Sequence, residues 1–102
     1  MGGKSMSQSI GLLEVKGLTA SVEATDAMVK SASVSYVGCR TTSETVLIVI
    51  SGEYNAVCAS LEIGLRQAQS FGVEVTKHVI AIPHQDTKKV LEDLLSSNTS
   101  LS

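Results

Sequence analysis

The residues best suited to chemistry lie in the stretch VGCRTTSETVLIVI, residues 37–50, where a polar segment separates two apolar ones. Cys39 begins this segment and Glu44 ends it, and no glycine lies between them. A thiolate is a reactive group and a metal ligand, and hydroxyls and charges beside it can bind polar molecules. Because functional residues concentrate on loops, a loop here would be the first candidate site of the chain.

The other candidate ligands have simpler explanations. Cys58 follows the apolar Val57 in an expected helix, where core packing accounts for it. His78 and His84 are too far apart to share one helical face, and no carboxylate or cysteine completes a metal spacing around them. The sequence also shows no nucleophile–base pair, phosphate-binding glycine loop or paired carboxylates. We therefore expect that the chain is not an enzyme.

Composition limits the partners and the compartment. The 102 residues fit one domain, and eight basic against ten acidic residues leave a net charge of -2 with no basic run. Together with only three aromatic residues, this argues against nucleic acid as a partner. No apolar stretch approaches the roughly 20 residues that span a bilayer, and the start lacks the order of a secretory signal. Two cysteines are too few for a disulfide framework, so we expect a cytoplasmic protein without a membrane partner.

Apolar periodicity and turn residues predict seven elements that would position the polar segment. The alternating and β-branched stretches favour strands, while apolar residues at three- and four-residue steps favour helices. In the first helix we expect the apolar face to contain Leu18, Val22, Ala24, Thr25 and Val29. The expected strands are 10–15, 33–38, 45–50 and 73–82, and the expected helices are 18–32, 55–72 and 84–95, the last capped by Asp86.

The order of these elements predicts an α+β fold of the ferredoxin-like, split βαβ type, with an appended C-terminal helix. In such a sandwich two helices cover one face of the sheet, and the other face must meet water, the last helix or a neighbouring subunit. The unbroken apolar run TVLIVI, residues 45–50, indicates burial on both faces. We therefore expect oligomerisation to cover part of the second face.

Several motifs resemble bacterial microcompartment shell proteins that carry one BMC domain and form hexamers. The opening GLLEVKGLTASVEATDAMVKSASVSYVG, residues 11–38, is similar nearly position for position, including the Glu-x-Lys-Gly stretch 14–17 and the DAMVKSA segment 26–32. The stretches GEYNAVCASLEIG, residues 52–64, and HVIAIPHQD, residues 78–86, resemble later motifs of the family. The resemblance runs from about Ile10 to Leu95 in the ordinary, non-permuted order.

The resemblance implies a structural subunit of a microcompartment shell in the bacterial cytoplasm. Six copies would form a flat disc, a homohexamer, with a central pore for small metabolites and with other shell proteins as neighbours. The implied shell domain comprises residues 10–95. We expect a disordered leader at residues 1–9, part of which is interpreted as added during cloning, and a flexible polar tail at residues 96–102. A divergent member from glycyl-radical-type microcompartments fits the same motifs.

In the family, the turn between the second and third strands lines the pore, usually with glycines. Here that turn reads CRTTSE, one residue shorter than usual and without glycine, so six-fold symmetry would make a ring of each side chain. The pore-lining residues that the resemblance implies are Cys39, Arg40, Thr41, Thr42, Ser43 and Glu44.

Two alternatives remain open at this point. Some shell proteins of glycyl-radical-type microcompartments hold an iron–sulfur cluster in the pore, and Cys39 thiolates that converge on the axis would be its metal ligands. Otherwise Cys39 is a small residue packed at the end of a strand, and the protein needs no cofactor. A small regulatory or ligand-binding domain of ferredoxin-like fold is the further alternative that the fold alone permits.

The resemblance also implies which residues form the hexamer edge. Lys30 matches the edge lysine through which hexamers meet, and Ile82, Pro83 and His84 match the family's Pro-Arg-Pro-His stretch. Ile82 stands where that stretch has its arginine, which removes a rigid donor of several hydrogen bonds. We expect Ile82 to serve a mixed contact with another shell protein, and flat tiling by this chain alone to be weakened.

Overall fold

The computed structural model describes residues 7–31, 33–83 and 87–95. The predicted order of strands and helices is confirmed, and the chain runs β-α-β-β-α-β with a third helix at its end. The elements are β1 Ser7–Lys16, α1 Leu18–Ser31, β2 Ser35–Thr41, β3 Thr45–Gly52, α2 Tyr54–Gln69, β4 Val75–Pro83 and α3 Thr87–Leu95. Among the described residues, no helix is long and apolar enough to cross a membrane.

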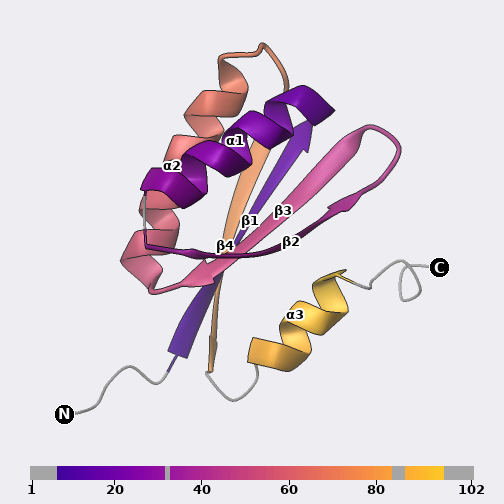
Figure 1. Ribbon diagram of the computed structural model, residues 1–102. Helices are drawn as coiled ribbons and strands as arrows, with labels where there is room; N and C mark the ends of the chain where they lie inside the picture. The colour runs from indigo at the N-terminus through magenta and orange to yellow at the C-terminus, as the bar shows by residue number, and fades with distance from the viewer. Residues whose placement is uncertain (1–6, 32, 84–86, 96–102) are drawn as a thin grey trace.

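The four strands form one sheet in the order β2-β3-β1-β4, and each neighbouring pair is antiparallel. Helices α1 and α2 lie side by side on one face of this sheet, whereas α3 lies on the other face (Figure 1). This is the ferredoxin-like, split βαβ sandwich that the sequence predicts. Strands β2 and β4 are the two edges of the sheet, so both flanks of the molecule end in a strand with one unpaired side.

Strand β3 divides its side chains between two cores, which confirms the predicted burial on both faces. Val46, Ile48 and Ile50 pack in the core under α1 and α2. Leu47 and Val49 point the other way and pack with Ile10 and Ile82 in a second, smaller core. Strand β3 needs this run of apolar residues because a central strand between two helical layers exposes neither of its faces to water.

Close contact between α1 and α2 depends on small residues at their crossing. A Cβ placed on Gly64 of α2 would lie 2.6 Å from both Cγ and Sδ of Met28 on α1. One helical turn before Gly64, the buried Ser60 donates a hydrogen bond from Oγ to the carbonyl oxygen of Met28 at 3.2 Å. The absence of a side chain at Gly64 thus creates the space that Met28 fills.

Helix α3 covers part of the second face of the sheet. Val90, Leu94 and Leu95 of α3 pack against the second core. Gly38 of β2 allows this approach, since a Cβ there would lie 3.3 Å from Cδ2 of Leu95. The last helix is thus one of the covers that the sequence allows, and partial cover by oligomerisation stays a prediction.

The element boundaries differ from the predictions mainly at β1 and β2. Ser7 and Ser9 pair with β4, so the leader expected at 1–9 is strand in its last three residues. Strand β2 reaches Thr41, because residues 39–41 continue the ladder with β3. Residues 1–6, His84, the predicted cap Asp86 and the predicted tail 96–102 lie outside the described residues.

The predicted apolar face of α1 is largely wrong. The buried residues of this helix are the small Ala20, Ser21 and Ala24, together with Met28. Leu18 and Val22, which we expected to be buried, are 68% and 58% exposed. The helix buries the stripe of small residues because these let its backbone approach the sheet and α2 closely. Its larger apolar residues are left facing β2.

Candidate functional site

The turn between β2 and β3 comprises only Thr42, Ser43 and Glu44, and all three residues are exposed. The backbone N–H of Thr42 donates to the carbonyl oxygen of Thr45 at 2.9 Å, which closes the hairpin. No residue other than glycine has a positive φ in the described chain, so this turn needs no glycine. The six-residue turn expected from the sequence is therefore half strand and half turn.

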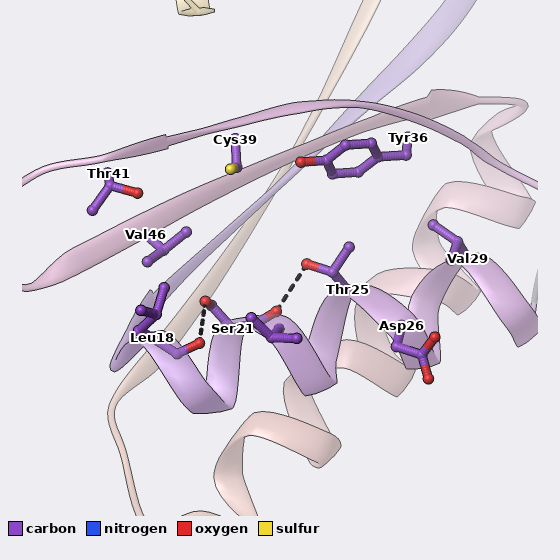
Figure 2. Close-up of a pocket in the computed structure, with 10 residues that line it drawn as sticks. Leu18, Ser21, Thr25, Asp26, Val29, Tyr36, Cys39, Thr41 and Val46 are labelled. Atoms are coloured by element: carbon purple, nitrogen blue, oxygen red, sulfur yellow. Dashed lines mark hydrogen bonds between the residues drawn. The ribbon is translucent and has the colours of Figure 1, made fainter.

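Cys39, Arg40 and Thr41 belong to β2, where successive side chains point to opposite faces of the sheet. Cys39 and Thr41 point toward α1 (Figure 2). Arg40 shares the face of Gly38, which is the α3 side, and its Nε is buried with no hydrogen-bond partner among the described residues. The structure thus separates the predicted pore-lining set into an exposed tip and three strand residues behind it.

The register places the turn and the predicted edge residues at opposite ends of the sheet. Thr45, next to the turn, pairs with Lys16 at the C-terminal end of β1. At the other end of β1, Ser7 pairs with Pro83. Ser35, which follows the end of α1 near Lys30, also pairs at that far end, with Ser51. The polar turn thus lies at one end of the sheet, and Lys30 and Pro83 lie at the other.

The expected edge residues have different environments. Lys30 is exposed and forms an ion pair with Asp26 at 3.0 Å. Pro83 ends β4, and His84 lies outside the described residues. Ile82 is only 5% exposed because it is packed in the second core below α3. Its side chain therefore stabilises the protomer itself, which argues against the expected edge role, and that role stays a prediction.

A groove of about 330 Å³ lies between α1 and β2. Its apolar wall is formed by Leu18, Val22 and Val29 of α1, and Tyr36 and Cys39 of β2 face them (Figure 2). Sequence reasoning missed this groove, although the apolar stripe along α1 was the signal that pointed to it. We assigned that stripe to the core, whereas the structure leaves it open.

Cys39 and Tyr36 are neighbours in this groove. The register of β2 shifts between Tyr36 and Gly38, and this bulge brings Tyr36 and Cys39 to the same side of the strand. Hydrogen bonding with the Cys39 side chain raises the pKa of the Tyr36 hydroxyl, and burial and the charge of the thiolate add to the effect. The thiol is thus held beside a neutral phenol, at the wall of the groove and behind the turn.

The described residues contain no group of three or more His, Cys, Asp or Glu side chains that could hold a metal ion. Cys39 and Cys58 are both free thiols on different elements. Each stands next to a tyrosine, since Tyr54 on α2 has its pKa raised mainly by hydrogen bonding with Cys58. The protomer alone therefore offers single thiols at separate places.

The Tyr36–Cys39 contact is open to a direct test. With Tyr54→Phe as background, Tyr36 is the only tyrosine, and we expect its absorbance change near 295 nm to occur at a pH above the ordinary tyrosine pKa of about 10. The raised pKa favours the neutral phenol in the folded protein. Any stability that it confers is therefore fully present below the ordinary tyrosine pKa, and it is lost as the pH rises through the raised pKa of the folded protein. Cys39→Ala should move the midpoint back down; an unchanged midpoint would show that the two side chains do not interact.

Comparison with known proteins gives a consistent family. The family model described as "BMC domain" matches residues 9–83. The bacterial microcompartment shell protein PduA of Salmonella typhimurium is 42% identical over 82% of this chain and 90% of its own length. The shell protein EutM of Escherichia coli K12 is 35% identical over 91% of this chain and 97% of its own length. The carboxysome shell protein CcmK2 of Synechocystis is 37% identical over 84% of this chain and 86% of its own length.

A solved structure supports the same assignment. The crystal structure of a microcompartment protein from Desulfitobacterium hafniense matches with a TM-score of 0.64 and 30% identity. It covers 72% of this chain, which spans 40% of that longer chain. The relatives are shell proteins, so the prediction that the chain is not an enzyme is confirmed. With a matching domain model, relatives matched along most of their length and the same fold, the chain belongs to the BMC-domain family of bacterial microcompartment shell proteins.

Proposed function

We propose that the chain closes into a ring of six copies, with Thr42–Glu44 around a central pore and the end that carries Lys30 and Pro83 at the rim. The observation that supports this arrangement is that the exposed polar turn and the edge residues lie at opposite ends of one sheet. In a closed ring, each copy presents one end to the axis and the other to its outer neighbours. The flanks then contact the adjacent copies.

The pore of this ring would be polar at its tip. Six copies of Thr42 and Ser43 provide hydroxyls that exchange hydrogen bonds with a passing molecule, and six Glu44 carboxylates add a ring of negative charge. Arg40 is set back on the α3 face, so its guanidinium does not neutralise this ring within one protomer. The proposed gate passes small polar metabolites and disfavours anions.

At the rim, Lys30 is exposed, whereas the hydrocarbon side chain of Ile82 has no hydrogen-bond donor and is buried in the protomer. We propose that other shell proteins complete the layer around this hexamer, within a microcompartment shell in the bacterial cytoplasm. The relatives' names, which describe microcompartment and carboxysome shells, support this location.

The iron–sulfur alternative stays a prediction, and the geometry favours the metabolite pore over it. Cys39 lies in β2 behind the turn and points toward α1, whereas a cluster on the axis needs thiolates that project from the pore end. The family match likewise favours a shell subunit over a regulatory ligand-binding domain of the same fold. An iron and sulfide assay on anaerobically purified protein separates the two shell alternatives.

Cross-linking tests the proposed pore directly. In a background with Cys39→Ser and Cys58→Ser, a cysteine introduced by Ser43→Cys should form disulfides between chains on mild oxidation, because ring symmetry brings the turns together. The matched control is Glu53→Cys, an exposed position that adjoins Gly52 at the far end of β3. We expect dimers on a non-reducing gel for Ser43→Cys and monomers for Glu53→Cys in dilute solution. Equal cross-linking of both variants would contradict the placement of the turn at the axis.

A further inference from the structure

The face of the sheet that carries α3 has an apolar part and a polar part. Below α3 lie the buried side chains of Ile10, Val49 and Ile82. Closer to the turn between β2 and β3, the strand residues that alternate onto the same face are polar and exposed. On β1 and at β4 these are Glu14, Lys16, Glu74, Thr76 and His78. The polar part is therefore an open surface next to the polar turn.

One row of this surface crosses the sheet from β2 to β4. The register aligns Arg40 with Leu47, and Leu47 with Glu14. The row continues from Glu14 to Thr76 on β4. Leu47 belongs to the core on the α3 side, which identifies the face that the row occupies. Arg40 and Glu14 thus flank Leu47 at two strand spacings, with their Cα atoms about 10 Å apart.

Arg40 and Glu14 are charged groups without an ion-pair partner among the described residues, whereas their neighbours are paired. On the same face, Nζ of Lys16 lies 3.4 Å from a carboxylate oxygen of Glu74. Arg40 is half-buried, and its Nε is buried with no hydrogen-bond partner among the described residues. A partly desolvated donor of this kind calls for an external partner, and Glu14 beside it is exposed to solvent. The row therefore offers one cation and one anion for binding.

We propose that this row binds a short zwitterionic metabolite, whose carboxylate contacts the guanidinium of Arg40 and whose ammonium group contacts Glu14. The inference rests on the proposed ring, which places the row beside the mouth of the pore, and it names the class of molecule that the pore takes up from the α3 side. A guanidinium donates two parallel hydrogen bonds to a carboxylate, and Leu47 supplies an apolar floor for the carbon chain between the two charges. A simple anion or a simple cation would use only one end of the row.

The side-chain Nε–H signals of arginine in a nitrogen–proton NMR spectrum test this site, because Arg40 and Arg66 are the only arginines of the chain. Arg66 is exposed on α2, on the other face of the sheet, and serves as the internal control. β-Alanine should shift the Arg40 signal in a saturable manner and leave the Arg66 signal in place. Acetate, which lacks the ammonium group, should bind about threefold more weakly, as expected for the loss of one exposed ion pair. Acetate that binds as tightly as β-alanine, or equal shifts of both signals, would overturn the inference.

A pair of matched variants assigns the preference to Glu14. Glu14→Gln should make the affinities for β-alanine and acetate equal, whereas Glu53→Gln, the same change at an exposed position beyond the far end of β3, should leave the preference unchanged. A preference that survives in Glu14→Gln would contradict the assignment. Light scattering on the same samples separates the two proposals. Rings of six without any preference for β-alanine would overturn this inference alone, and a monomer would overturn the proposed function.

Discussion

Ile82→Arg is expected to lower the free energy of unfolding by about 3 kcal/mol or more, since it places a charge in the core below α3. Ile82 is 5% exposed and packs with Ile10, Leu47 and Val49. These neighbours have hydrocarbon side chains, so the guanidinium would be buried against apolar groups. A urea unfolding curve followed by circular dichroism measures the loss.

The control for this variant is Ile82→Val, which removes one methylene group and should cost about 1 kcal/mol. The comparison separates the effect of the buried charge from the effect of lost volume. If Ile82→Arg unfolds at the same urea concentration as the unmodified protein, Ile82 must face water. In that case the edge role expected from the family pattern would be restored.

Gly64→Leu is the second variant with a large expected effect, because no side chain fits where α1 and α2 cross. Its Cβ would lie 2.6 Å from Cγ and Sδ of Met28 and 3.1 Å from Cδ2 of Leu13, and both of these side chains are fully buried. Overpacking of a core typically costs about 1–3 kcal/mol, and a leucine at this position belongs at the upper end or beyond. The higher helix propensity of leucine offsets about 1 kcal/mol of that cost.

The matched control is Ala59→Leu, which adds a leucine at an exposed position of the same helix. Its unfolding midpoint should differ from that of the unmodified protein by no more than an ordinary surface substitution causes. Combining Gly64→Leu with Met28→Ala should recover part of the loss, because truncation of Met28 vacates the space that the leucine needs. A double variant no more stable than Gly64→Leu alone would mean that Met28 is not the obstacle.

The sequence was sufficient for the fold where one physical signal dominated. The apolar run of β3 has no wet side, and the structure buries its residues between two cores. In α2, Val57 and Leu61 repeat at helical spacing and are buried as expected. Periodicity predicts the buried face of α2 correctly because the larger apolar residues of this helix are also its buried ones.

Residue size and burial disagree in α1, and there the sequence was misleading. Its larger apolar residues line an open groove, while the small Ala20 and Ala24 form the buried face. Only the distance between the helix and the sheet decides which stripe is buried, and a single sequence does not contain that distance.

The position of the polar turn was predictable from the sequence, but its length was not. The polar segment does lead into an exposed hairpin turn, but the ladder with β3 takes Cys39, Arg40 and Thr41 into β2. Strand pairing depends on the partner strand, so the end of β2 could not be read from its own residues. The bulge after Tyr36, which turns the thiol toward the groove, is likewise a property of the pair of strands.

The mass of the assembled protein in solution tests the central proposal most directly. On a sizing column with multi-angle light scattering, we expect one species of six times the 10.7 kDa chain at micromolar concentration, and native mass spectrometry should give the same stoichiometry. A monomer, a dimer or a trimer as the only species would contradict the ring, and with it the pore formed by Thr42–Glu44.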